Sequence, residues 1–417
     1  MAPDRTDALP AGNLPRRSAG GRLQLLAETR VLDLTTSLAG PYASLLLADL
    51  GADIIKIERP GVGDDARHWR PPTLGGEALW FLSINRNKRS IGLDYSKPEG
   101  ALVLHDLVRS ADVVISNELP RVQGKLGIGY AELAKIRPDL VYVSLTGFGL
   151  QGARANLPCY DLIAEGYSGV MDLTGEAGGD PQKVGTPAAD LLAGMDAALG
   201  CLAALLDRSR TGNGHLVDVS LVESMTRFMT PRLVSYLGSG DLPHRSGAKD
   251  SVIAIYQVFA TLDAPITLGL ANDAIWRRFC EATGRADWLE DAALKDNAGR
   301  VGRRSELVGK IGALLQERPR SEWLALFGRF GVPAGPINTL AEVSVDPELH
   351  RSGLLYALET RLGQVPQVRL GIKFDEQSAG YDFAPPGLGE HSTQILGELL
   401  NYPASRIAEL QEKGLVQ

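Results

Sequence analysis

The stretch 30-RVLDLTTSLAGPYASLLLADLGADIIKIE-58 decides the fold class of this chain. Its first part, RVLDLT, is a short apolar run of the kind found in buried strands, and its last part, ADIIKIE, is another. Between them, PYASLLLADLG predicts a helix that ends at Gly51. A strand, a helix and a strand in so short a stretch favour two parallel strands joined by a right-handed crossover.

The same alternation continues towards the C-terminus. RSIGLD, DVVISN and LVYVSLTGFG predict further strands, and KPEGALVLHDLVRSA predicts a helix after the first of them. A long apolar helix at 191–206 is followed by Gly212 and Gly214 and then by another strand candidate, HLVDVSL. The pattern therefore predicts an α/β domain with a parallel sheet and helices on its faces.

The length of 417 residues favours two domains. After a linker-like stretch at 238–252, IAIYQVFATLDAPITLGL predicts a hairpin, and DAIWRRFCEATG, GRRSELVGKIGALLQ and RSEWLALFGRFG predict helices of a smaller α+β domain. The N-terminal tail is polar and lacks the apolar core of a signal peptide. We expect this tail to be disordered, and an organelle-targeting segment is the alternative. The expected organisation is a disordered tail at 1–21, the N-terminal part of the large domain at 22–224, the small domain at 225–335, and a return to the large domain with C-terminal helices at 336–417.

The composition narrows the classes of partner. Hydrophobic residues make up 44% and charged residues 22%, as in ordinary soluble globular proteins, and the net charge is −7. Without an overall basic field, neither nucleic acid nor an anionic membrane surface is an expected partner, and no run of about 18 apolar residues predicts a membrane span. The three cysteines form neither a CxxC pair nor a zinc-like spacing with histidine. This predicts no metal site and a reducing compartment, cytoplasmic or, in a eukaryote, mitochondrial.

A parallel sheet binds its ligand beyond the carboxyl ends of its strands. Here these ends supply TTSLAG after the first strand, Glu58–Arg59 after the second, and Ser116–Glu118 and Thr146–Gly149 after later ones. No GxGxxG motif follows the first strand, so a standard dinucleotide site is not expected. Cations near these ends predict either a local site for a phosphate-bearing ligand or a solvated run of charge. They are Arg59, Arg67, Arg70, Arg86, Lys88 and Arg89.

Asp190 stands at the mouth of the long apolar helix. Aspartate is a good N-cap for a helix beginning at Leu191, a role worth roughly 1 kcal/mol, and the spacing alone favours this interpretation because most capping aspartates do nothing else. A reactive carboxylate held at a helix start is the alternative. The two roles are compatible, since the backbone N–H groups and the macrodipole would keep the carboxylate ionised.

Several segments of the chain stand together in a fixed order: VLDLTTSLAGPYAS, GADIIKIERPGVGDDAR, NRNKRSIGLD, LVYVSLTGFGLQG, YDLIAEGYSG, ADLLAG with RTGNGHLVDVSL, GVPAGPIN and GEHSTQIL. In this combination, from about residue 28 to the C-terminus, the chain resembles the family III CoA-transferases. The resemblance implies a Rossmann-like parallel-sheet large domain, a smaller α+β domain and an interlocked-ring homodimer. It also implies coenzyme A (CoA) as the nucleotide, and the 3′-phospho-ADP part of CoA would account for the cations.

The resemblance also implies roles for individual residues. Asp190 aligns with a catalytic aspartate, which would attack the thioester of an acyl-CoA and form an aspartyl anhydride while CoA moves to a carboxylic acid acceptor. No permanently bound cofactor is implied. The likeness through PGVGDDAR, GYSGVM and GVPAGPIN is closest in character to succinyl-CoA transferases that act on dicarboxylates. The implied CoA contacts are Leu38, Ala39, Arg59, Leu93, Asn117, Lys125, Pro158, Tyr160 and Asp161.

Some residues depart from the family pattern and leave alternatives open. The racemase branch of the family uses a histidine in a segment that aligns with Cys159–Asp161, where this chain has Tyr160. A phenol with a pKa near 10 is a poor substitute for imidazole, so transfer is favoured over racemase or epimerase activity. Asp161 either orients substrate or is structural. HRSGAKDSV matches a glycine-rich active-site lid but contains only Gly247. A non-catalytic CoA-binding paralogue is the alternative outside the enzymes.

Overall fold

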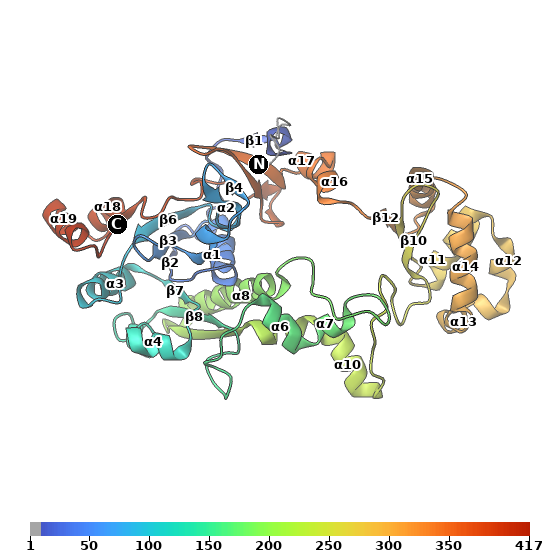
Figure 1. Cartoon of the computed structure of the whole chain (residues 1–417), viewed down its shortest axis with the longest axis horizontal. Coiled ribbons are helices and arrows are strands. Elements are labelled where there is room, and N and C mark those ends of the chain that lie inside the picture. Colours follow the sequence, from blue (N-terminus) through green and yellow to red (C-terminus); the bar gives the residue numbers. More distant parts are fainter. Residues whose placement is uncertain (1–9) are drawn as a thin grey trace. The chain divides into compact units, whose positions relative to one another are not determined.

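A six-stranded parallel sheet forms the core of one compact unit of the computed structural model, which describes residues 10–417 (Figure 1). Its strand order is β6-β3-β2-β7-β8-β9, so the chain starts inside the sheet at β2, builds one half outwards, and then returns to build the other half. The direction of winding therefore reverses between β2 and β7, and such a switch point is where doubly wound sheets bind ligands. The strands are β2 (Arg30–Asp33), β3 (Asp53–Glu58), β6 (Lys88–Gly92), β7 (Val113–Ser116), β8 (Val141–Thr146) and β9 (His215–Ser220).

These strands match the segments predicted from the sequence, and the prediction of a parallel sheet is confirmed. Val31 and Leu32 point to opposite faces of β2 and are both fully buried, so both faces of the sheet are covered. Helix α3 (Pro98–Ser110) and helix α19 (Ala404–Glu412) share one apolar cluster with Leu32. Helix α1 (Ala39–Asp49) packs on β2, β3 and β7.

Helix α8 (Ala188–Thr211) packs against α1 and against strands β8 and β9. Gly194 permits the close approach, because a Cβ atom there would lie only 2.7 Å from the carbonyl oxygen of Ala39. By length and composition alone, α8 is also apolar enough to cross a membrane. A core helix of a soluble protein passes the same test, and α8 packs on α1 and on the sheet, although some of its large apolar side chains stay exposed.

The chain divides into two compact units. One runs through Ser168 and adds Val184–Met229 and Ser344–Gln417, and the other consists of Gly169–Lys183 and Thr230–Val343. Gly169–Lys183 joins the second unit through contacts such as the Gly247 N–H donating to the Gly175 carbonyl at 2.8 Å. Such contacts join residues far apart in the chain, so the local sequence pattern gives no sign of them.

The second unit is an α+β structure. Its antiparallel sheet contains the predicted hairpin as β10 (Tyr256–Phe259) and β11 (Ile266–Gly269), with β12 (Ala334–Pro336) added at the edge of β11. The three predicted helices are present, and aromatic side chains of the first and third together with aliphatic side chains of the second contribute to the core of the unit. These helices are α11 (Asp273–Thr283), α14 (Arg304–Leu315) and α15 (Arg320–Phe330).

Two local predictions need correction. The tail expected to be disordered over 1–21 is ordered where the structure describes it, because Arg16–Arg17 pairs with β13 (Leu355–Thr360) and the Tyr381 hydroxyl donates to the Arg17 carbonyl at 2.8 Å. Residues 1–9 lie outside the described residues. The stretch VESMTRFMTPRLVSYL predicts one helix after the strand HLVDVSL. The structure has two helices there, α9 (Leu221–Phe228) and α10 (Thr230–Ser239), because the proline in the stretch lacks the N–H that a continuous helix needs.

The remaining elements connect and cover these layers. They are η1 (Pro10–Asn13), η2 (Asp65–His68), β4 (Thr73–Leu74), β5 (Glu77–Ala78), α2 (Leu79–Ile84), α4 (Pro120–Leu126), α5 (Tyr130–Leu133), α6 (Asp161–Ser168), α7 (Val170–Leu173), α12 (Ala286–Glu290), η3 (Ala292–Leu294), α13 (Asn297–Gly302), α16 (Leu340–Ser344), α17 (Pro347–Arg351), β14 (Gly363–Val368), β15 (Lys373–Phe374), β16 (Gln377–Ser378), α18 (Ser392–Gln394) and η4 (Ile395–Leu399).

Candidate active site

Two adjoining cavities open at the carboxyl ends of β2 and β7, at the switch point of the sheet. Their volumes are about 350 Å³ and about 230 Å³. Thr36, Asp65 and Glu118 line both cavities, so the two share a wall. This is the edge at which the sequence predicted a ligand.

The loop between β2 and α1 lines the smaller cavity and is held in place from β7. The Thr36 N–H donates to Asn117 Oδ1 at 3.2 Å, and Asn117 Nδ2 donates back to the Thr36 carbonyl at 2.9 Å. Asn117, predicted as a CoA contact, thus lines the cavity and also clamps its wall. The next residue, Ser37, has a left-handed backbone with φ of 72°.

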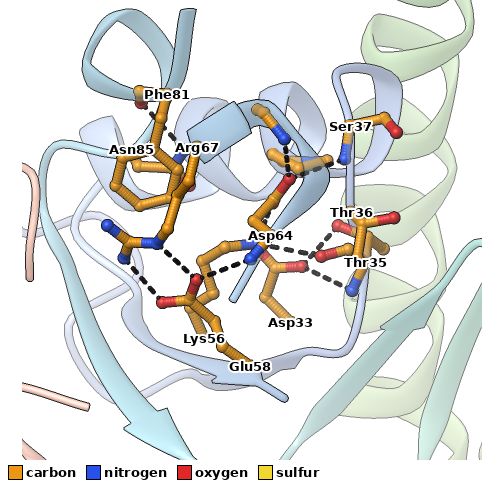
Figure 2. Close-up of polar contacts among 12 residues, drawn as sticks. Asp33, Thr35, Thr36, Ser37, Lys56, Glu58, Asp64, Arg67, Phe81 and Asn85 are labelled. Carbon is orange, nitrogen blue, oxygen red and sulfur yellow. Dashed lines mark hydrogen bonds and ion pairs between the residues drawn. The ribbon is translucent and has the colours of Figure 1, made fainter. Parts of the chain in front are cut away.

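A buried network of charges adjoins the larger cavity, whose wall includes Glu58 and Asp64 (Figure 2). Lys56 Nζ pairs with Asp64 Oδ2 at 2.7 Å, and both side chains are fully buried. Glu58 accepts two hydrogen bonds from the Arg67 guanidinium, each of 2.8 Å. Burial of a charge is costly unless it is paired, and each of these charges has its partner at hydrogen-bonding distance. The network therefore ties the loop after β3 to the strand that carries it.

Most of the cations predicted to form a phosphate site instead form ion pairs with acids of the same chain. The prediction of a phosphate site is therefore wrong for these paired residues. Arg67 pairs with Glu58, Lys88 with Asp33 at 3.1 Å, Arg89 with Asp53 at 2.8 Å, and Arg86 with Asp49. They are not a solvated run of charge either, because acids of the sheet and of α1 neutralise them within the protein interior. For Lys88, burial outweighs the attraction of Asp33 and lowers the pKa of the ammonium to about 8.

The larger cavity has a mixed charge. Arg59 and Leu93, both predicted CoA contacts, line it, and Arg59 is exposed, whereas Arg70 lies in neither cavity wall. Asp65, Asp94 and Glu118 also line this cavity, and burial with the charge of Asp65 raises the pKa of the Glu118 carboxyl. Predicted contact Lys125 is exposed on α4, next to Leu126 in the wall. An anion here would depend on Arg59 and Lys125.

Asp190 lies in the smaller cavity but does not cap its helix. Helix α8 begins at Ala188, after Pro187, and among the described residues the Asp190 side chain makes no capping hydrogen bond. The predicted helix start at Leu191 is therefore wrong, and so is the N-cap role. Asp161 supplies the cap instead, because its Oδ1 accepts from the Ala189 N–H at 2.8 Å and from the Asp190 N–H at 3.3 Å. These bonds agree with the structural alternative for Asp161.

The surroundings of Asp190 favour its neutral form. Burial, and then the negative charge of Asp161, raise the pKa of the Asp190 carboxyl from 3.8 to about 7. The sequence predicted the opposite, on the ground that a helix start stabilises an anion. Desolvation outweighs the helix dipole here, although the side chain remains partly exposed. At neutral pH, about half of the molecules carry the ionised carboxylate.

Sequence reasoning missed one neighbour of Asp190. Cys159 lines the same cavity, and burial followed by the charge of Asp190 raises the pKa of its thiol to about 11. The thiol is thus neutral at pH 7, and it lacks the thiolate form that acts as a nucleophile. Cys159 stands directly before Tyr160, so its position in a predicted contact turn was the signal available. A Cβ atom at Gly147 would lie 2.1 Å from the Cys159 Cβ, which explains the glycine at that strand end.

The structure thus gathers most of the predicted site residues. Within residues 10–417, no group of three or more His, Cys, Asp and Glu side chains could hold a metal ion. The smaller cavity brings together Leu38, Ala39, Asn117, Pro158, Tyr160 and Asp190, and the larger one has Arg59 and Leu93.

Comparisons with known proteins point to one family. The family model described as CoA-transferase family III matches residues 26–392. A succinyl-CoA:glutarate CoA-transferase of Mus musculus is 35% identical over 393 residues, which cover 94% of this chain and 90% of the relative. A succinate–glutarate CoA-transferase of Agrobacterium fabrum is 38% identical and covers 90% of this chain and 95% of the relative. Among solved structures, a CAIB/BAIF family protein from Brucella suis has a TM-score of 0.79 and 36% identity, covering 91% of this chain and 100% of that one.

Proposed function

The chain belongs to CoA-transferase family III, and we propose that Asp190 is the nucleophile with which it moves CoA from an acyl-CoA to a carboxylic acid. The observation that carries the proposal is the placement of Asp190 in a cavity that adjoins a second, larger one at the switch point. A thioester could lie beside Asp190 while the nucleotide part of CoA occupies the larger cavity near Arg59.

The proposed reaction proceeds through covalent intermediates. An oxygen of the ionised Asp190 attacks the thioester carbonyl, the C–S bond breaks, and a mixed anhydride and CoA thiolate form. The thiolate then attacks the aspartyl carbonyl, which releases the donor acid and leaves CoA on Asp190. The acceptor carboxylate attacks this aspartyl thioester and expels the thiolate. The thiolate finally attacks the acceptor's carbonyl, which gives the new acyl-CoA and regenerates Asp190. No net proton is consumed or released.

The same cavity gives less support to racemase or epimerase chemistry. That reaction needs a second base near neutrality to exchange the proton on the α-carbon, and imidazole is the usual choice. Tyr160 occupies the corresponding position, and within the described chain no histidine lines either cavity.

Dicarboxylic acids are the proposed acceptors, because glutarate appears in the names of relatives that match nearly the whole chain. We also propose the interlocked homodimer expected for this family. Large apolar side chains that stay exposed on α8 support a partner chain there, since exposed apolar patches of this kind mark protein contacts. They include Met195, Leu199 and Leu206, which are 53%, 67% and 56% exposed.

A transfer screen tests the proposal. Several acyl-CoA donors are incubated with a panel of mono- and dicarboxylic acids, and new acyl-CoA species are detected by mass spectrometry. With an active donor, hydroxylamine should trap Asp190 as a hydroxamate, and the Asp190→Asn variant should show neither the hydroxamate nor transfer. If CoA binds but no acid accepts it and Asp190 is never trapped, the chain is a non-catalytic CoA-binding protein.

A further inference from the structure

We infer that Asp64 is a positioning residue, because it holds Ser37 in the left-handed conformation that shapes the cavity wall next to Asp190. The reaction that Asp64 serves rests on the proposed function. The positioning itself rests on contacts between the loop after β3 and the loop after β2.

Ser37 has a φ of 72°, a conformation that a side chain disfavours because its Cβ crowds the neighbouring carbonyl oxygen. Glycine adopts this conformation without that penalty, so a serine here must be held by its surroundings. The hydrogen bond that does so joins the Ser37 N–H to Asp64 Oδ1 at 2.9 Å.

Asp64 is buried and is itself fixed by its neighbours. Its Oδ2 pairs with Lys56 Nζ at 2.7 Å, and its N–H donates to Glu58 Oε2 at 3.0 Å. Lys56 Nζ also donates to the carbonyl of Thr35 at 2.9 Å, so the same ammonium contacts both loops. A buried pair is screened little by salt, and it therefore acts as a lasting clamp between the two loops.

The residues after Ser37 carry this effect to the cavity that contains Asp190. Leu38 precedes the first residue of α1 and lines the cavity together with Ala39. Helix α1 touches α8 closely at Gly194, where a Cβ would lie 2.7 Å from the Ala39 carbonyl oxygen. If Ser37 relaxed to negative φ, the path of the chain at Leu38 would change and the wall beside Asp190 would move.

The test compares Asp64→Ala and Asp64→Asn, each with and without Ser37→Gly, by transfer kinetics and by calorimetric titration with CoA. Asn keeps an oxygen for the Ser37 N–H, so Asp64→Asn should lower kcat/KM less than Asp64→Ala, which should lower it by more than about tenfold. Since glycine accepts positive φ, Ser37→Gly should restore about tenfold in the Asp64→Ala background. This gain should exceed its effect in the wild type, which makes the two positions coupled.

The matched control is Asp49→Asn, which breaks the buried ion pair with Arg86. The loss of this pair should lower the urea midpoint. Because Asp49 lies at the end of α1 away from Ser37, Ser37→Gly should restore neither stability nor kcat/KM in the Asp49→Asn background. Wild-type kcat/KM in Asp64→Ala, or an equal effect of Ser37→Gly with and without Asp64, would overturn the inference. If Asp64→Ala does not fold, the Asp64→Asn pair decides by the same criterion.

A wild-type chain without transfer activity would instead contradict the proposed function. The positioning role would then be decided by the titrations alone, because Leu38 and Ala39 line the cavity whether or not chemistry follows. Weaker CoA binding in Asp64→Ala that Ser37→Gly restores would support the role, and unchanged binding would overturn it.

Discussion

The substitution Asp190→Asn should make the folded protein more stable at alkaline pH while it abolishes CoA transfer. Burial and the charge of Asp161 raise the pKa of the Asp190 carboxyl from 3.8 to about 7, so the folded state holds this proton more tightly than the unfolded state. The stabilising contribution of the proton is complete below pH 3.8 and is lost as the pH rises through about 7. Above pH 7, the ionised carboxylate therefore lowers the free energy of unfolding.

The magnitude follows from the two pKa values. A difference of about 3 pH units corresponds to about 4 kcal/mol. Because the Asp190 side chain is partly exposed, water screens the charge, and the expected gain for Asn at pH 8 is about 2 kcal/mol. Near pH 4 the gain should shrink towards zero. No capping energy is lost, since Asp161 caps α8 in either case.

Urea denaturation followed by circular dichroism at pH 4.5 and pH 8 measures the difference in stability, and mass spectrometry of acyl-CoA products measures transfer. Asp241→Asn, at an exposed acid after α10, controls for the loss of one charge and should show no such dependence on pH. A difference in stability that is equal at both pH values would refute the burial argument. Near-normal transfer in Asp190→Asn would show that the nucleophile lies elsewhere.

Three further outcomes follow from the site. The transfer rate of the wild type should rise with an apparent pKa near 7, because in the proposed mechanism only ionised Asp190 attacks, and Asp161→Asn should shift this midpoint to lower pH by removing a negative charge. A flat profile between pH 6 and 8 would contradict this. Arg59→Ala should weaken CoA binding about tenfold or more in calorimetry, whereas Arg70→Ala, at an exposed cation outside both cavities, should not. Lys88→Met should lower the free energy of unfolding by about 3–5 kcal/mol, because it removes the ion-pair partner of the buried Asp33 carboxylate. A loss of CoA affinity in Lys88→Met without loss of stability would instead restore the predicted phosphate role.

Strands such as β7 and β8 were predictable because each is a short, mostly apolar run, which is what burial on both faces of a parallel sheet requires. The order of the strands in the sheet could not be predicted, because it depends on which strands pair with β2, and the sequence pattern does not give this pairing. The charge network was hidden for a related reason. Arg67 and Glu58 are nine residues apart and Lys88 and Asp33 are 55 apart, so local spacing gives no sign that these charges meet.

The site shows the same division between local and tertiary information. Resemblance to a family placed Asp190 in the site, and the strand ends placed the cavity. The chemistry of Asp190 depends instead on burial in the folded chain, which raises the pKa of its carboxyl most, and then on the charge of Asp161, 29 residues earlier, whose Oδ1 contacts the Asp190 N–H. A helix start recognised in the sequence predicts that the Asp190 carboxylate is stabilised as an anion. In the folded chain, the Asp190 carboxyl is instead buried beside Asp161, which favours its neutral form.

That reversal has a consequence for reactivity. A carboxylate with a pKa near 3.8 is a weak nucleophile, although it is fully ionised at pH 7. Raising the pKa to about 7 makes the ionised form more basic, and about half of the molecules still carry it at neutral pH. In the proposed mechanism, the same burial that lowers the stability of the ionised protein thus gives Asp190 a basicity suited to attack on a thioester at neutral pH. Asp161 contributes to both stability and basicity. Its oxygen caps α8, and its charge adds to the effect of burial in raising the pKa of Asp190.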